Sequence, residues 1–149
     1  MEKISNADLI AIEEIKQMKA RYCRFVDTKQ WESLRVLLAV EAKLSFEGQD
    51  GEQLYKFDGR DQWIDLTSGV LAKARTVHQV HSPEIEVLSA TRAKGIWGME
   101  DIIEMPEGIE APFKTMHGFG HYYEELEKTD SGWIIISMVL KRTKLNQIT

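Results

Sequence analysis

The order of the expected elements predicts an α+β fold, in which helices come first and a run of antiparallel strands follows, with one more helix inserted. Near the N-terminus apolar residues recur every three or four positions, the spacing of an amphipathic helix. From residue 84 onward they alternate with polar residues, the period of a half-buried strand. We see no βαβ alternation, internal repeat or linker, so we expect a single domain over residues 1–149.

The first helix is expected from near Ser5 to about Asp27. Ser5 followed by Asp8 fits a capping box, with Asp in place of the usual Glu. Thr28 is then expected to cap a shorter helix over residues 31–38. The expected buried stripe of the first helix is Leu9, Ile12, Ile15, Met18, Tyr22 and Val26, and its expected solvent face is Glu13, Glu14, Lys16, Lys19 and Arg21. A third helix follows residues 59–61 and carries Trp63, Ile64, Leu66, Val70 and Leu71.

Strands are expected at residues 42–46, 55–57, 84–87, 91–104, 115–128 and 133–142, and residues 75–81 open a further strand-like run. A hairpin turn is expected at 129–132 and a loop at 106–112. The last strand is apolar on both faces. One expected face is Ile134, Ile136, Met138 and Leu140, and the other is Trp133, Ile135, Ser137 and Val139. Such a strand needs cover on both faces, and few helices are available. We therefore expect a homo-oligomer in which a second subunit supplies the missing cover.

Composition excludes several classes of function. The net charge of −5 argues against nucleic acid as the main partner, because phosphate binding needs a basic surface. The one cysteine, Cys23, allows no intramolecular disulfide and fits a reducing compartment. No apolar run approaches the roughly twenty residues of a membrane span, and the first residues lack a signal-peptide pattern. We expect a cytoplasmic protein with neither nucleic-acid nor membrane partners.

Two segments far apart in the chain, residues 20–27 and 75–81, carry candidate catalytic residues. An Asp beside a His fixes the tautomer of the imidazole and raises its basicity, so Asp27 and His78 together would form a general base. The alternative is that Asp27 caps a helix and His78 lies on the surface. Tyr22 is either a core tyrosine or a third member of the site, and it converges with Asp27 only if the helix ends near that residue.

Asp101 shares its strand face with Trp97 and Met99, both large and apolar. A carboxylate on such a face is costly unless it is paired or lies in a pocket, so Asp101 is a further candidate; the alternative is that the apolar face ends before it. The four histidines, His78, His81, His117 and His121, follow no metal-binding motif, so no metal site is expected, and His121 is expected to line a pocket or to pack. Cys23 is interpreted as a small packing residue.

Taken together, these segments resemble the SnoaL-like branch of the nuclear transport factor 2-like superfamily, close to scytalone dehydratase and bile acid 7α-dehydratase. The resemblance covers nearly the whole chain and implies a cone-shaped antiparallel sheet wrapped around a pocket, often in trimers. The segments that carry it are AIEEIK (11–16), RYCRFVD (21–27), GRD (59–61), TVHQVHSPEI (76–85), WGMED (97–101), GHY (120–122) and GWII (132–135), with Trp31 and Leu34.

The resemblance implies that Asp27 pairs with His78, and that Tyr22 and Asp101 match further positions of the bile acid enzyme's pattern. The function it implies is a cofactor-independent lyase, a dehydratase, acting on a small hydrophobic ring-containing substrate. Alternatives are an isomerase, a polyketide cyclase, or a non-catalytic β subunit of a ring-hydroxylating dioxygenase. Not all substrate-binding hydroxyls and amides of scytalone dehydratase are matched. Apolar side chains, with one histidine, are expected to line the pocket: Phe25, Trp63, Trp97, Met99, Phe113, Met116, Phe119 and His121.

Overall fold

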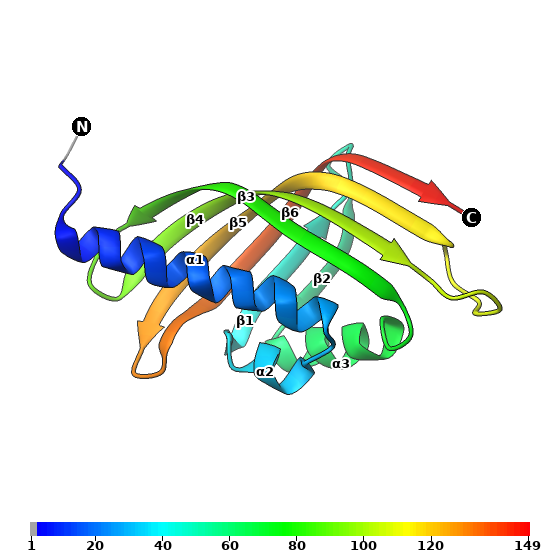
Figure 1. The fold of residues 1–149 in the computed structure, drawn as a ribbon, viewed down its shortest axis with the longest axis horizontal. Coiled ribbons are helices and arrows are strands. Elements are labelled where there is room, and N and C mark those ends of the chain that lie inside the picture. Colours follow the sequence, from blue (N-terminus) through cyan, green and yellow to red (C-terminus); the bar gives the residue numbers. More distant parts are fainter. Residues whose placement is uncertain (1–2) are drawn as a thin grey trace.

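A computed structural model describes residues 3–149 (Figure 1). Within that range the chain forms three helices and six strands. The helices are α1 (Asn6–Asp27), α2 (Trp31–Arg35) and α3 (Arg60–Val70). The strands are β1 (Leu38–Glu47), β2 (Gln53–Asp58), β3 (Arg75–Val87), β4 (Arg92–Glu104), β5 (Thr115–Thr129) and β6 (Gly132–Ile148).

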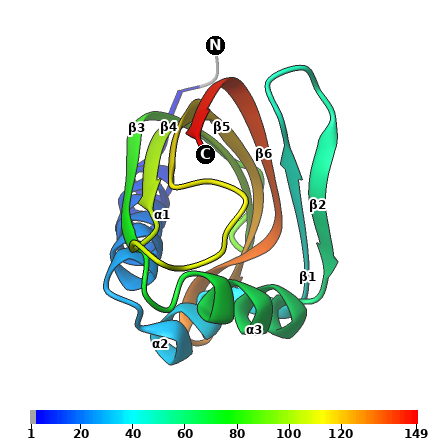
Figure 2. The same cartoon turned by 90° about the vertical axis from the view of Figure 1, so that its right-hand side faces the viewer.

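The strands form one sheet in the order β2-β1-β6-β5-β4-β3, in which β1 and β6 are parallel and every other pair is antiparallel. Figure 2 shows the sheet curling from β3 around to β1 and β2, with α1 beside β3, α2 and α3 across one end, and the yellow β4–β5 loop across the opening. The predicted α+β fold with a curved sheet is confirmed.

The boundaries of α1 follow from its caps. The Ser5 hydroxyl accepts a hydrogen bond from the Asp8 N–H (3.1 Å), and the Asp8 carboxylate accepts one from the Ser5 N–H (3.0 Å), so the predicted capping box is present. Thr28 ends this helix by donating its hydroxyl to the Arg24 carbonyl at 2.6 Å. The prediction that Thr28 caps the second helix is wrong, because Gln30 occupies the N-cap of α2.

The second helix is shorter than the predicted span of residues 31–38. It ends at Arg35, and β1 begins at Leu38. The Leu37 carbonyl accepts a hydrogen bond from the Ile135 N–H at 2.9 Å. The backbone is therefore already paired with β6 where the apolar pattern still suggests a helix. β6 in turn extends six residues beyond its predicted end at Arg142, because its polar last segment pairs with the start of β5.

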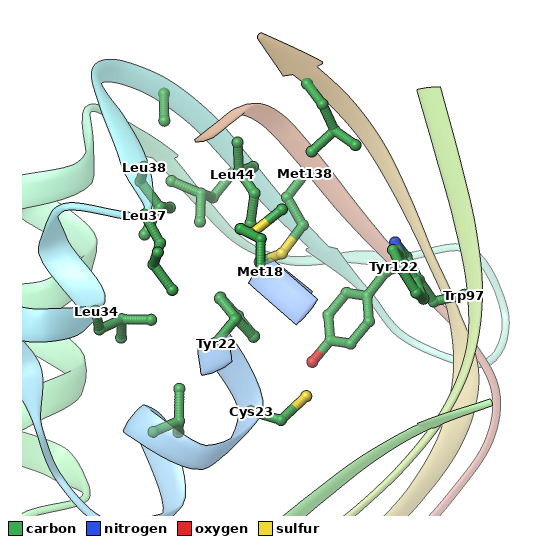
Figure 3. Close-up of a cluster of buried hydrophobic side chains, with 14 of the residues drawn as sticks. Met18, Tyr22, Cys23, Leu34, Leu37, Leu38, Leu44, Trp97, Tyr122 and Met138 are labelled. Carbon is green, nitrogen blue, oxygen red and sulfur yellow. The ribbon is translucent and has the colours of Figure 1, made fainter. Parts of the chain in front are cut away.

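The core lies between α1 and the concave face of the sheet (Figure 3). The buried stripe of α1 differs from the predicted one: Leu9 is 53% exposed, whereas Lys19 is completely buried. The observed stripe is Ala11, Ile15, Met18, Lys19, Tyr22, Cys23 and Val26. The prediction that Lys19 faces solvent is wrong, because the stripe is broad enough to include this position and the sheet supplies a carboxylate opposite it.

A β-bulge at Ile136 changes the faces of β6. Ile135 pairs with Leu126 and Ser137 with Glu125, so Ile136 has no partner opposite it. The extra residue places Trp133 and Ile135 on the buried face together with Met138 and Leu140. The predicted face of Ile134, Ile136, Met138 and Leu140 is therefore wrong, since strict alternation cannot anticipate a bulge.

Candidate active site

The concave side of the sheet encloses a cavity of about 350 Å³, within the size range of small-molecule sites. Most of its lining is apolar and comes from α1, α3, the β1–β2 hairpin and the strands. Several polar side chains also line it, and those that matter for the site are Tyr22, His78, Asp101, Tyr122 and Arg142. Since they reach the cavity from α1, β3, β4, β5 and β6, the curvature of the sheet brings them together.

Asp27 and His78 are in direct contact. The Asp27 Oδ1 lies 2.7 Å from the His78 Nδ1, although 51 positions separate the two residues. The same carboxylate accepts the Thr76 hydroxyl at 2.8 Å and the backbone N–H of His78 at 2.9 Å. All these donors belong to β3, so the carboxylate fastens the end of α1 to that strand.

This network sets the chemistry of the imidazole. An ionised carboxylate only accepts hydrogen bonds, so the Nδ1 of His78 carries the proton that it donates to Asp27. In the neutral imidazole the Nε2 is then the basic nitrogen, on a residue that lines the cavity. The side chain of His78 is 10% exposed, and Asp27 lies behind it without lining the cavity.

Asp101 is buried and paired. Its face of β4 continues the buried face of Trp97 and Met99, so the alternative of a solvated Asp101 is wrong. Arg142 donates to both carboxylate oxygens, at 2.8 and 2.9 Å. Burial opposes the charge of the guanidinium, but the hydrogen bonds and negative charge of Asp101 outweigh that effect and raise the pKa of Arg142. The two parallel hydrogen bonds have the bidentate geometry of an arginine–carboxylate ion pair.

A bare stretch of backbone makes room for this pair. A Cβ atom at Gly118 would overlap the guanidinium of Arg142 and crowd the carboxylate of Asp101. The Asp101 Oδ2 also lies 3.9 Å from the His78 Nε2, too far for a hydrogen bond but close enough for both to contact one ligand. The sequence analysis missed Arg142; the signal was its position two and four residues after the buried Leu140 and Met138.

Tyr22 and Tyr122 complete the polar end of the cavity. Their rings meet edge to face at 6.2 Å, and Tyr22 stacks parallel to Trp63 at 6.1 Å. Burial raises the pKa of both phenols well above the usual value of a tyrosine. Both hydroxyls therefore stay protonated at neutral pH and can donate hydrogen bonds.

Behind the tyrosines lies a fully enclosed ion pair, which the sequence analysis also missed. Lys19 contacts Glu124, and both side chains are 0% exposed. The ammonium lies over the rings of Tyr22 and Tyr122, at 3.9 and 3.8 Å from their centroids. Trp97 donates its indole N–H to the second oxygen of Glu124 at 3.0 Å.

The sequence matches the SnoaL-like domain family over residues 7–139. The chain belongs to this family. A curated relative of this SnoaL-like domain is "Probable cyclase FGR4" of Gibberella zeae, with 24% identity over 86% of the chain and 88% of the relative. The family match over residues 7–139 spans nearly all of the helices and strands of the structure.

Solved structures place the same fold in proteins of several kinds. A protein from Novosphingobium aromaticivorans provisionally named scytalone dehydratase has a TM-score of 0.82 at 21% identity, covering 97% of this chain and 91% of that one. The hexachlorocyclohexane dehydrochlorinase LinA type 2 has a TM-score of 0.77 at 19% identity over 96% and 92%. The benzoate 1,2-dioxygenase β subunit of Burkholderia mallei has a TM-score of 0.70 at 16% identity over 95% and 93%.

Some of the side chains expected to line the pocket do so in this SnoaL-like domain and others do not. Trp63, Phe113 and Met116 line the cavity. Phe119 and His121 do not, because the inward face of β5 is occupied by Gly118, Gly120 and Tyr122.

Three further side chains expected in the lining also lie elsewhere. Trp97 and Met99 are buried in the core, and Phe25 packs beside Arg24.

The remaining histidines lie apart from the cavity lining. His81 and His121 are exposed, and His117 pairs with Glu100 at 2.7 Å. Within residues 3–149 no group of three or more His, Cys, Asp or Glu side chains is placed to hold a metal ion. No helix in the described part of the chain has the length and apolar character needed to cross a membrane.

Proposed function

We propose that this protein is a metal- and cofactor-independent lyase, a dehydratase that acts on a small apolar ring-containing substrate. The observation that carries the proposal is the imidazole of His78, held by Asp27 and lining a mostly apolar cavity. Positioned imidazole bases typically accelerate proton transfer by about 10²–10⁴-fold. The carboxylate behind the ring stabilises the imidazolium that forms when the proton is taken.

The reaction begins when the Nε2 of His78 removes a proton from a carbon next to a carbonyl group of the substrate. The electrons of the C–H bond form a C=C bond, and the C–O bond to a neighbouring hydroxyl breaks. The imidazolium of His78 returns the proton it accepted to the leaving oxygen, which departs as water. This transfer restores the neutral imidazole, so that the only net loss from the substrate is one water.

Tyr22, Tyr122 and Arg142 supply the hydrogen-bond donors for this step. A protonated phenol can donate to the departing hydroxyl or to the developing oxyanion, and Tyr22 is the favoured donor. Arg142 uses two of its N–H groups on Asp101, so others stay free for a substrate oxygen. Asp101 positions the substrate through Arg142, because both of its oxygens accept hydrogen bonds from the guanidinium and hold it in place.

The decisive experiment compares two histidines of the same strand. His78→Ala should lower kcat by about 10²–10⁴-fold, whereas His81→Ala, an exposed neighbour on β3, should leave it unchanged. Turnover is measured on a panel of β-hydroxy ketones with apolar rings, by following the loss of water with mass spectrometry. Equal activity of the two variants would refute the role of His78.

A cyclase or an isomerase is the second candidate, because both reactions also begin with proton abstraction. The curated relative named as a cyclase supports this alternative. Product mass separates the two at once, since an isomerase leaves the mass of the substrate unchanged and a dehydratase removes one water.

A non-catalytic role as the β subunit of a ring-hydroxylating dioxygenase is the third candidate. The likeness to a benzoate 1,2-dioxygenase β subunit supports it. The half-buried Asp27–His78 pair counts against it, because a scaffold has no need of a cavity-facing base. Obligate co-purification with a larger iron–sulfur subunit would favour the scaffold.

We also propose that the protein assembles as a homo-oligomer, with the trimer expected from the family resemblance. Apolar side chains of β4 and β6 that do not belong to the core, among them Ile96, Ile102 and Ile134, support a subunit contact on the outer face of the sheet. Sedimentation equilibrium tests this, and a monomer at micromolar concentration would contradict it.

A further inference from the structure

The charged side chains of the cavity lie at its polar end, near His78. Among the described residues that line it, Arg142 is the one Lys or Arg side chain, and its charge is matched by Asp101. These two side chains are only 7% and 3% exposed, so water and salt screen their interaction weakly. Asp27 adds a second carboxylate directly behind His78. The polar end of the cavity therefore carries one carboxylate and one guanidinium, and a second carboxylate lies directly behind the His78 ring.

We infer that Asp101 determines substrate specificity by charge: it neutralises Arg142 and thereby makes the site select uncharged ligands. An anionic group that reached Arg142 would lie beside the carboxylate of Asp101 and would have to displace it. A neutral carbonyl or hydroxyl oxygen accepts from a free N–H of the guanidinium and leaves the pair intact. The substrate class is then an apolar ring compound with a neutral oxygen at its polar end, and it excludes carboxylates and phosphate esters.

The fold holds the pair in place from several sides. Gly118 leaves the space that the guanidinium and the carboxylate fill, so the two groups meet across bare backbone of β5. β4 and β6 carry the two residues on either side of that strand. A pair built into three adjacent strands is present before any ligand enters, so charge selection is a property of the empty site.

Binding of two matched probes tests this inference without requiring turnover. 2-Acetylnaphthalene and 2-naphthoate have the same ring system and differ in the charge of the polar group. Isothermal titration calorimetry at pH 7.5 should give the ketone a Kd at least about tenfold below that of the carboxylate. Asp101→Asn leaves the charge of Arg142 without its carboxylate partner, so the variant should bind naphthoate with a Kd at least about tenfold lower than that of the wild type. The Kd of the ketone should change by less than about threefold.

Glu100→Gln is the matched control, because the substitution is equivalent, the position is adjacent, and the side chain pairs with His117 instead of lining the cavity. It should leave both dissociation constants unchanged. Circular dichroism tests whether each variant is folded. If Asp101→Asn does not fold, the comparison of the two probes on the wild-type protein still tests the inference.

Three results would overturn the inference: a wild-type protein that binds naphthoate as tightly as the ketone, one that binds neither probe, or a folded Asp101→Asn protein with the wild-type preference. The inference rests on the proposed function only in calling the ligand a substrate. A protein that selects the ketone but catalyses no elimination contradicts the proposed function alone, whereas an active dehydratase without charge preference contradicts this inference alone.

Discussion

Two buried ion pairs lie on the concave side of the sheet, and they differ in their relation to the cavity. Asp101 and Arg142 line it and can contact a ligand. Lys19 and Glu124 are fully enclosed, with two tyrosine rings, the Trp97 indole and the Met138 sulfur around them. Both pairs adjoin the same two side chains, since Tyr22 and Tyr122 line the cavity on one side and cover Lys19 on the other.

The difference indicates separate roles for the two pairs: one can contact a ligand, and the other supports side chains that line the cavity. A buried ion pair adds little net stability compared with apolar residues of similar size, so its presence calls for another explanation. For the cavity pair that explanation is contact with a ligand. The enclosed pair does not line the cavity, but its ammonium lies against the rings of both Tyr22 and Tyr122. The enclosed pair therefore acts on the cavity indirectly, through the positions of Tyr22 and Tyr122.

The largest expected effect is the loss of one member of the enclosed pair. Lys19→Met leaves the Glu124 carboxylate buried, with the Trp97 indole as its one remaining donor among residues 3–149, and should lower the free energy of unfolding by about 3–5 kcal/mol. Urea denaturation followed by tryptophan fluorescence measures it. Lys16→Met, on the exposed face of the same helix, should change stability by less than about 0.5 kcal/mol. If both variants lost the same free energy of unfolding, the burial of the Lys19–Glu124 pair would not explain the loss in Lys19→Met.

Removing both charges should restore most of that stability. In Lys19→Met/Glu124→Gln no charge is left buried, and the amide still accepts the hydrogen bond of Trp97, so the free energy of unfolding should return to within about 1 kcal/mol of wild type. The equivalent double variant at the cavity, Asp101→Asn/Arg142→Gln, should also fold but should bind the ketone and naphthoate probes alike. If the first double variant stays as unstable as Lys19→Met, packing rather than charge explains the single loss.

The same contrast explains what could be predicted from the sequence. Asp101 can be identified because a carboxylate on an apolar strand face is an anomaly in the local pattern. Asp27 is an ordinary helix-end residue by local pattern, and its pairing with His78 follows from the family resemblance. Lys19 was not identified, since lysine on a helix normally faces solvent and its partner Glu124 lies 105 positions away. Arg142 was not predicted, because alternation after Met138 and Leu140 places it on their face but does not show that this face lines a cavity there.

Three glycines test how tightly each region is built. Gly118→Ala should displace the Arg142 side chain, abolish the preference for the ketone probe and lower the free energy of unfolding by about 1–3 kcal/mol. Gly120→Ala should cost more, because its Cβ would overlap the backbone of β6, which cannot move aside as a side chain can. Gly69→Ala in α3 meets open space and should stabilise the protein by about 0.5–1 kcal/mol. A Gly118→Ala protein with unchanged probe selectivity would contradict the requirement for bare backbone.

An effect that appears only at alkaline pH is expected at Cys23, which lies beside the enclosed pair. Burial raises the pKa of its thiol to about 11, although the charge of Lys19 opposes the shift. Between pH 9 and 11 the unfolded chain releases this proton and the native protein keeps it, so the unfolded state binds fewer protons and the free energy of unfolding falls as pH rises. Cys23→Ala cannot respond in this way. The stability advantage of wild type over Cys23→Ala should therefore shrink by about 2 kcal/mol between pH 8 and 10.5 in urea titrations. A constant difference would mean that the thiol titrates alike in both states, which would contradict its burial against the enclosed pair.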